Sequence, residues 1–392
     1  MPRRLLPVPP MRGDPSRRRR PRRTAARPSG SISGRRPGAG YPEGLALLKI
    51  AVLNTYAPFI RGGAEYLAES LTSKLREYGH EAALVRIPFS WEPPPKVLEG
   101  LLAARLVRIP GAQLVIGLKF PAYLVPHDNK VLWLLHQYRQ AYDLWNTPFQ
   151  GLPDTREGIQ IRDIVRQADN LYLRQAKKIF TNSHVTSNRL MQFNGIPSEV
   201  LYPPLFDARG LECEEYGDFV FCPGRVTTSK RQYLLVEALQ YCSPEVKLVI
   251  AGMEEAPEDG MLIRKLISDY GLGARVTFLN GFISEEQKAA YYRRALACAY
   301  VPYDEDSYGY VTLEAFHCKK PVLTCTDSGG IHILVKHGKT GFTAAPEPRA
   351  IAAALDAFYQ DKAATARMGS ASYDFIQSLH IDWDHVIAKL TQ

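Results

Sequence analysis

Residues 48–54 read LKIAVLN, and residues 62–79 read GGAEYLAESLTSKLREYG. The first stretch is a short continuous apolar run, which is typical of a buried parallel strand. The second stretch opens with two glycines, continues as an amphipathic helix over residues 64–78 and ends at Gly79, a residue type that commonly terminates helices. A buried strand followed by a glycine turn and an amphipathic helix is the repeating unit of a doubly wound α/β domain.

The same unit recurs along the chain. Strand-like runs in the first half are EAALVRI (81–87), LVIGL (114–118), VLWLL (131–135) and KKIFTNS (177–183). The stretch VLYPPLF (200–206) interrupts this alternation, because two successive prolines block a helix and disfavour the interior of a sheet. The runs that follow it are FVFCPG (219–224), VKLVIAG (246–252), RVTFLN (275–280) and ACAYVPY (297–303), with helices predicted over 230–240, 260–270 and 284–295.

The predicted fold is therefore α/β, with two Rossmann-like, doubly wound domains facing each other across a cleft. We expect the first domain over residues 48–202 and the second over residues 203–370, with residues 371–392 forming a C-terminal helix that crosses back to the first domain. Parallel sheets place their ligand crevices outside the carboxyl ends of the strands. Residues that directly follow the strand-like runs are therefore the candidates for function.

The positive charge of the chain is concentrated at its beginning. The net charge is +9, but the twelve arginines and one aspartate of residues 1–40 contribute +11, so residues 41–392 carry −2. This Arg/Pro-rich start has little to bury, and residues 1–47 are predicted to be a disordered extension. Three interpretations stay open for it: an extension without a structural role, an electrostatic tether to an anionic membrane or nucleic acid, and a targeting segment.

Composition also bounds the compartment and the partners. The slightly acidic body has no basic patch with interleaved aromatic residues, which argues against specific nucleic-acid binding. No apolar run approaches the ~20 residues of a membrane span, and no secretory signal core is present. The six cysteines form no CxxC pair, which suits a reducing cytosol. We expect a cytoplasmic protein, peripheral to the inner face of the membrane if the Arg-rich extension is a tether.

The second domain contains the stretch DEDSYGYVTLEAF (304–316). It combines carboxylates, a glycine that lets the backbone approach a ligand, and the first turn of a helix. A helix start binds anions through its free N–H groups and its dipole. Carboxylates would repel a bare phosphate, so the combination suits a ligand that carries hydroxyls beside its phosphates. A nucleotide sugar is such a ligand.

A pair of cations follows the strand-like run FVFCP. Gly224-Arg225 comes directly after the run, and Lys230 stands five residues later at the start of the next predicted helix. A bidentate guanidinium and a compact ammonium at the carboxyl end of one strand suit a diphosphate. The alternative is that both are solvated surface charges.

Together these motifs resemble family 4 of the retaining glycosyltransferases, which have the GT-B fold. The resemblance covers roughly residue 48 to residue 392, and it rests on Gly224-Arg225-x4-Lys230, on the spacing Asp306-x7-Glu314 and on the glycine-containing stretch from Gly329 to Gly341. It implies that the first domain binds the acceptor and the second the nucleotide-sugar donor. The donor diphosphate would contact Gly224, Arg225 and Lys230. The ribose hydroxyls would contact Glu314, and the donor hexose would contact Asp306.

The resemblance also implies that a helix start and the first domain complete the donor site. Backbone amides that would contact phosphate and sugar are those of Gly309, Tyr310 and Val311. Gly62-Gly63 matches the glycine-rich loop after the first strand, which would otherwise be an ordinary turn. His136 ends the run VLWLLH and would lie against the donor sugar; the alternative is a structural histidine.

Two positions carry open alternatives within this resemblance. Phe282 matches the place where the backbone pairs with the nucleobase, although a plain strand-to-helix turn would look the same. The first acid of the family motif is usually Glu, whereas Asp306 stands there in strict register. Ser307 looks like an insertion that would let Glu305 take the role. Which of Glu305 and Asp306 meets the sugar stays open at this point.

The reaction implied by the resemblance is that of a hexosyltransferase. A hexose would pass with retention from a nucleotide diphosphate sugar to a hydroxyl of a glycan, a lipid-linked sugar or a small molecule. We expect no cofactor and no metal, because Arg225 and Lys230 supply the positive charge that the leaving diphosphate needs. Two other classes stay open: a nucleotide-sugar isomerase such as a UDP-sugar 2-epimerase, and a non-catalytic nucleotide-sugar binder.

Overall fold

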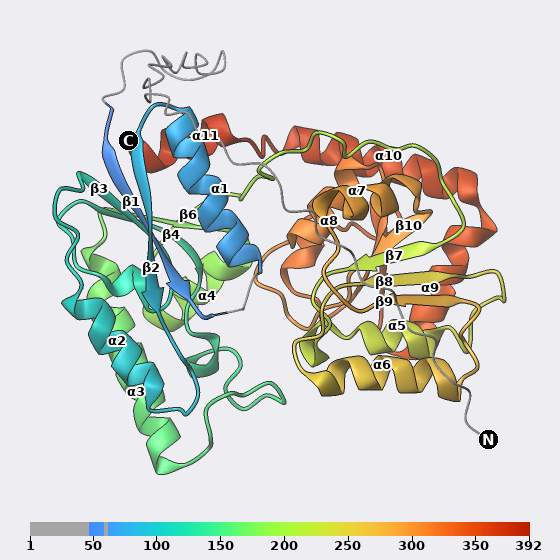
Figure 1. Ribbon diagram of the computed structural model, residues 1–392, viewed down its shortest axis with the longest axis horizontal. Helices are drawn as coiled ribbons and strands as arrows, with labels where there is room; N and C mark the ends of the chain where they lie inside the picture. The colour runs from blue at the N-terminus through green and yellow to red at the C-terminus, as the bar shows by residue number, and fades with distance from the viewer. Residues whose placement is uncertain (1–46, 59–61) are drawn as a thin grey trace, which may run out of the picture. The chain divides into compact units, whose positions relative to one another are not determined.

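The structure of the protein is a computed structural model that describes residues 47–58 and 62–392 (Figure 1). Within these residues, two six-stranded parallel sheets with helices on both faces form two α/β domains. This arrangement confirms the predicted fold class of two Rossmann-like domains. The disordered extension predicted over residues 1–47 lies outside the described residues, apart from Leu47.

The first sheet begins with the strand predicted from LKIAVLN. Its parallel strands are β1 (Lys49–Tyr56), β2 (Glu81–Pro88), β3 (Leu114–Lys119), β4 (Lys130–His136), β5 (Lys178–Thr181) and β6 (Glu199–Val200). Their spatial order is β2-β1-β3-β4-β5-β6. The strand order therefore reverses between β1 and β3, and in such sheets the ligand crevice opens at the reversal, outside the carboxyl ends.

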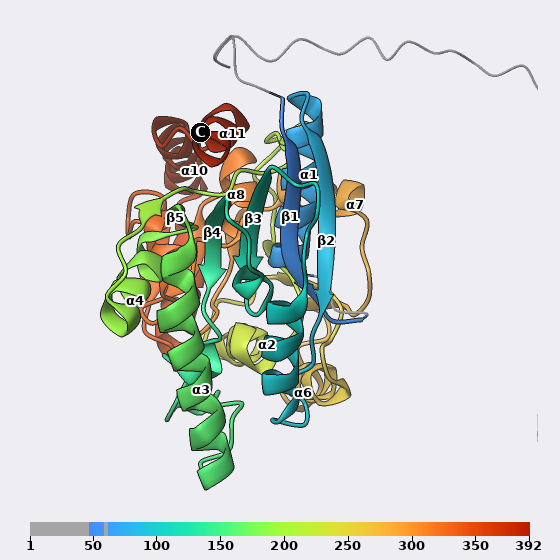
Figure 2. The same ribbon diagram turned by 90° about the vertical axis from the view of Figure 1, so that its left-hand side faces the viewer.

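Alternate residues of β1 face two different helix layers. Ile50 and Val52 pack with α1 (Gly63–Glu77) and α11 (Trp383–Thr391). Ala51 and Leu53 pack on the other face, where the covering helices are α2 (Lys96–Leu106), α3 (Arg156–Tyr172) and α4 (His184–Asn194); Figure 2 shows α2 and α3 in front of the strands. All four side chains are at most 3% exposed, which explains why the strand reads as a continuous apolar run.

The second sheet repeats this design. Its parallel strands are β7 (Val220–Pro223), β8 (Leu248–Ala251), β9 (Val276–Leu279), β10 (Ala297–Ala299), β11 (Val322–Cys325) and β12 (Gly341–Ala344). Their spatial order, β12-β11-β10-β7-β8-β9, is that of a Rossmann sheet, with the reversal between β7 and β10. One face is covered by α5 (Gln232–Ala238), α6 (Pro257–Asp269) and α9 (Pro348–Gln360), and the other by α7 (Glu285–Arg294), α8 (Tyr310–His317) and α10 (Lys362–Ser378).

The helix predicted over residues 230–240 begins later than expected. Arg231 has a φ of 56°, in the left-handed region, and it separates a short 3-10 turn, η4 (Thr228–Lys230), from α5. Its guanidinium donates to both carboxylate oxygens of Asp327 and to the carbonyls of Val301 and Pro302. These contacts offset the cost of the strained backbone, and they involve residues too distant in sequence to be anticipated.

The chain returns to the first domain at its end. Trp383 and other apolar side chains of α11 belong to the buried cluster that also contains residues of β1 and α1. Trp383 Nε1 donates to the carbonyl of Leu205 at 2.7 Å, and its ring lies edge-on to Trp133, with centroids 6.4 Å apart. The last helix thus ties the C-terminal segment to the core of the first domain.

Two further properties concern the chain's environment. No helix within the described residues is both long enough and apolar enough to pass through a lipid bilayer. All six cysteines are free thiols.

We expect Trp383→Ala to lower the free energy of unfolding by about 3–5 kcal/mol, because it removes a buried indole and leaves a cavity between α11 and the first sheet. Urea unfolding followed by circular dichroism measures the change. Trp91→Ala is the matched control, since Trp91 is 40% exposed and should cost far less. Equal losses for the two variants would contradict this role of α11.

Candidate functional site

The two motifs predicted in the second domain meet at its strand reversal. Gly224 and Arg225 follow β7, which ends at Pro223, and residues 300–306 follow β10, which ends at Ala299. Strands β7 and β10 are paired neighbours. Residues far apart in sequence are therefore brought together at the edge where doubly wound sheets bind ligands.

Lys230 and Glu305 form the centre of this site. The Lys230 ammonium donates to the hydroxyl of Tyr300 at 2.7 Å and to Glu305 Oε2. The Tyr300 hydroxyl in turn donates to the same carboxylate oxygen at 3.1 Å. Burial alone would raise the pKa of Glu305, but the adjacent Lys230 outweighs it and holds the pKa below its usual value. The carboxylate is thus kept ionised beside a fixed cation.

Glu314 occupies a second polar cluster, one turn inside α8. Its Oε1 accepts from Lys288 Nζ at 2.8 Å, and its Oε2 accepts from the Tyr292 hydroxyl at 2.8 Å. Burial raises the pKa of Glu314, and the Lys288 charge opposes that rise. Both partners project from α7, at positions one helical turn apart.

The start of α8 requires a glycine. Gly309 has a φ of 67°, and a Cβ at this position would lie 2.5 Å from Cε1 of Tyr300. Any other residue would therefore be strained and would clash. Tyr310 and Val311 open the helix directly after it. The first turn of α8 therefore begins shortly after Glu305, the partner of Lys230, in the sequence.

Arg225 lies between the two domains. Its guanidinium is 38% exposed and donates to Glu255 Oε1 at 3.1 Å. A Cβ on Gly62 would lie 3.5 Å from Arg225 Nη2, so the glycine turn of the first domain adjoins this cation. The Gly62 N–H donates to Glu65 Oε2 at 2.9 Å, which fixes the turn at the start of α1.

The same turn also adjoins the start of α8. A Cβ on Gly63 would lie 3.5 Å from the ring of Tyr310. The ring of Tyr66, one turn into α1, meets the Tyr310 ring edge-on at 4.9 Å between centroids. The buried Tyr310 hydroxyl has no hydrogen-bond partner among the described residues. Gly62 and Gly63 therefore lie beside Arg225 and Tyr310, two residues of the second domain that are predicted to contact the nucleotide sugar.

His136 ends β4, at the carboxyl edge of the first sheet. Its Nδ1 lies 2.5 Å from the carbonyl oxygen of Gln137. Because a carbonyl only accepts, Nδ1 carries the proton, and Nε2 is the acceptor in the neutral ring. Burial lowers the pKa of His136, although Asp306 opposes this. The imidazole is therefore neutral near pH 7.

The carboxylates of Glu305 and Asp306 point to different partners. Asp306 is 7% exposed and its Oδ1 pairs with the guanidinium of Arg189; Arg139 Nε is 3.4 Å away. Both arginines belong to the first domain. Of the two acids left open by the sequence, Glu305 is therefore the one beside Lys230, and Asp306 lies in an interdomain ion-pair cluster.

Phe282 occupies the turn between β9 and α7. Its side chain is 82% exposed. The predicted contact involves its backbone, and that role stays a prediction, as do the ligand contacts of the other site residues.

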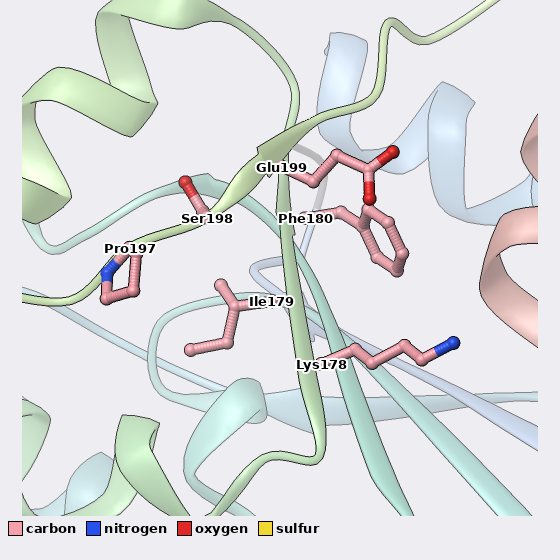
Figure 3. A pocket seen from close by; sticks show the side chains of 6 residues that line it. All are labelled: Lys178, Ile179, Phe180, Pro197, Ser198 and Glu199. Carbon is pink, nitrogen blue, oxygen red and sulfur yellow. The ribbon is translucent and has the colours of Figure 1, made fainter.

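Two cavities of the described part are lined by other residues. One of about 580 Å³ follows β5 and β6, where Figure 3 shows the side chains of Lys178, Ile179, Phe180, Pro197, Ser198 and Glu199. Another, of about 420 Å³, lies between the start of α4 and the loop at Gly329. Within the residues that the structure describes, no group of three or more His, Cys, Asp or Glu side chains is placed to hold a metal ion.

Sequence reasoning missed several side chains that complete the site. Lys288 and Tyr292 stand four residues apart in a predicted helix, so the sequence indicates that they share one helix face. It does not indicate that this face meets Glu314. Tyr300 lies within the strand-like run 297–303, and in the structure it directly follows β10, which ends at Ala299. The ion-pair partners of Arg139 and Arg189 carried no signal in the sequence, because they lie 165 and 117 residues away.

Residues 209–375 match the family described as "Glycosyl transferases group 1". This segment contains β7 to β12 and every site residue predicted in the second domain. The family match therefore coincides with the second α/β domain.

Curated relatives match over parts of the chain. The mouse α-1,3/1,6-mannosyltransferase ALG2 is 32% identical over 109 residues, which is 28% of this chain and 26% of that protein. The D-inositol 3-phosphate glycosyltransferase of Mycobacterium avium (strain 104) is 29% identical over 246 residues, 58% of this chain and 55% of that protein. The chain thus covers between about a quarter and somewhat over half of the length of these relatives.

Solved structures match over most of the chain. The Anabaena protein HepE in complex with UDP and glucose aligns with a TM-score of 0.64 at 19% identity, over 87% of this chain and 98% of that one. Sucrose-phosphate synthase from Thermosynechococcus elongatus aligns with a TM-score of 0.69 at 18% identity, over 88% and 97%. At this identity the likeness establishes the fold, which is GT-B.

We expect the stability of the protein to fall as the pH drops below about 6.5, the usual His pKa, partly because of His136. Its folded pKa is lowered by burial, so the unfolded chain binds the proton more readily and acid favours unfolding. Thermal unfolding between pH 7.5 and 5.5 measures this, and His136→Gln should flatten the slope. An NMR titration that gives His136 a pKa above 6.5 would refute the assignment.

Proposed function

We propose that the protein is a hexosyltransferase that moves a hexose from a nucleotide diphosphate sugar to a hydroxyl acceptor, with retention and without a metal. The acceptor is a glycan, a lipid-linked sugar or a small molecule. The supporting observation is the arrangement at the strand reversal of the second domain. Cations at Arg225 and Lys230 lie at the same sheet edge as the carboxylates of Glu305 and Glu314, which suits a ligand with phosphates and hydroxyls.

The hydrogen-bonding capacity at Lys230 and Glu305 supports this division of roles. An ammonium has three donors, and two of them serve Tyr300 and Glu305, which leaves one for a phosphate oxygen. Among the described residues, Glu305 is contacted at Oε2, which leaves Oε1 to accept from a sugar hydroxyl. We therefore assign the hexose contact to Glu305, and the ribose contact to Glu314.

The chemistry that these groups support is electrostatic. In the transfer, the bond between the anomeric carbon and the diphosphate oxygen breaks, and the acceptor oxygen attacks from the same face. The acceptor proton passes to the departing phosphate oxygen. Arg225, Lys230 and the start of α8 stabilise the charge that develops on the diphosphate, which is where preorganised donors contribute most to rate.

The choice of donor follows from the relatives as a starting hypothesis. HepE was solved with UDP and glucose, and ALG2 is named a mannosyltransferase. UDP-glucose and GDP-mannose are therefore the first donors to test.

A panel of UDP-, GDP- and ADP-sugars should contain at least one that raises the melting temperature, because a ligand that binds only the folded state stabilises it by mass action. Differential scanning fluorimetry at several donor concentrations measures the shift. Incubation of that donor without acceptor, followed by NMR, should show no epimer. An epimerised sugar would replace the transferase proposal with an isomerase, and no shift with any donor would contradict both.

Arg225→Ala and Lys230→Ala should each lower turnover by about 10²-fold or more, the scale for losing one preorganised donor to a developing charge. Release of the nucleoside diphosphate in the presence of donor and acceptor measures it. Lys247→Ala is the matched control, since Lys247 is an exposed lysine paired with Asp218, and it should keep wild-type turnover. Near-normal turnover in both site variants would rule out the assigned diphosphate site.

A further inference from the structure

The run Asp304, Glu305 and Asp306 joins the two domains. Side chains alternate along it: Glu305 turns to Lys230 of its own domain, whereas Asp304 and Asp306 turn to the first domain. The back of the run is fixed within the second domain, because the Asp304 N–H donates to the Asp327 carbonyl at 2.8 Å and the Glu305 carbonyl accepts from Gly330 at 2.7 Å. The side chains of Asp304 and Asp306 are paired with residues of the first domain.

The contacts from the first domain are ionic and largely buried. Arg189, on α4, donates to Asp304 Oδ2 at 2.6 Å and also pairs with Asp306. Arg139, in the 3-10 turn η2 (Arg139–Ala141) after β4, donates to the Asp304 carbonyl at 2.8 Å and to its Oδ2 at 3.2 Å. The side chains of Arg139 and Arg189 are 15% and 11% exposed.

Two neighbours lock these arginines in place. Asp143 accepts from Arg139 Nε at 2.7 Å and lies 3.5 Å from Arg189, so it orients both. Ser183, the N-cap of α4, donates its hydroxyl to the Asp306 carbonyl. The arginines therefore meet the run in a fixed geometry, and the start of α4 adds a neutral contact to the same residue.

Charge balance makes the run depend on the first domain. It has three adjacent carboxylates, and the cations that pair with it within the described residues are Lys230, Arg139 and Arg189. Two of these three belong to the other domain. Without them, three adjacent carboxylates would face one ammonium, and their like charges would repel one another. Asp304 also has a φ of 44°, a conformation that needs support from its surroundings.

We propose that Arg139 and Arg189 are positioning residues, which hold the Asp304–Asp306 run so that Glu305 is presented to the donor site only while the two domains are docked. The ion pairs at Asp304 and Asp306 fix the residues on either side of Glu305. Placement of the sugar-binding carboxylate is thus coupled to the interface with the acceptor domain. This inference rests on the proposed function where it concerns the sugar, but the holding of the run is independent of it.

Arg189→Gln removes the ion pairs of Arg189 with Asp304 and Asp306 while keeping a polar side chain. Hydrogen exchange in the peptide spanning residues 300–309 should become about tenfold faster, because the run opens locally. Asp306→Asn removes the Arg189–Asp306 ion pair by changing the acid instead of the arginine. It provides a second variant for the test if Arg189→Gln folds poorly. Arg189→Lys should restore part of the protection. Arg367→Gln is the control, as Arg367 is 72% exposed and 3.8 Å from Asp361.

Binding gives the second readout, with the nucleotide sugar that most stabilises the wild type and its nucleoside diphosphate as probes. In Arg189→Gln, the Kd of the nucleotide sugar should rise about tenfold, while that of the nucleoside diphosphate stays unchanged. A merely structural role would weaken both equally and would overturn the proposal, as would wild-type exchange in residues 300–309. If the wild type binds no nucleotide sugar, the proposed function fails, and the exchange rates alone decide whether the arginines hold the run.

Discussion

The candidate site depends on one constraint of parallel sheets: every strand ends at the same edge. In the second sheet this brings the residue after β7 and the segment after β10 together at the reversal of strand order. In the first sheet it brings the end of β1 and the end of β4 to one edge, so Gly62 and His136 share it. Because all strands of a sheet end at one edge, residues from loops that are far apart in the sequence can serve one ligand.

Burial imposes a second condition on that edge, since charges removed from water must be paired. Lys230 is matched by Glu305, Lys288 by Glu314, and the aspartates of the 304–306 run by arginines of the first domain. Tyrosine hydroxyls complete the first two pairs at 2.7 and 2.8 Å. The pairs are therefore fixed in position before any ligand is present, which is what electrostatic stabilisation of a developing charge requires.

The sequence made the architecture predictable but not the orientation of the acids. LKIAVLN was recognisable as a doubly buried strand, because Ile50 and Leu53 lie on opposite faces and both are apolar. Arg225, Lys230 and Glu314 could be named as candidates from their positions after strands and inside a helix, and their ligand contacts stay predictions. In contrast, no local pattern distinguishes Glu305 from Asp306. Their directions are set by Lys230 and by Arg189, 75 and 117 residues away, and such partners emerge only when the domains are folded and in contact.

A ligand at this site need not break the pairs that hold it. Lys230 retains one donor, Glu305 retains Oε1, and each Glu314 oxygen has a second lone pair beside its present partner. A phosphate oxygen and sugar hydroxyls can therefore be added to existing ion pairs. In the proposed complex, binding would add charge-assisted hydrogen bonds to groups whose desolvation cost was met on folding. Under the proposed function, the acids would keep the cations in place, and their remaining lone pairs would recognise the hydroxyls.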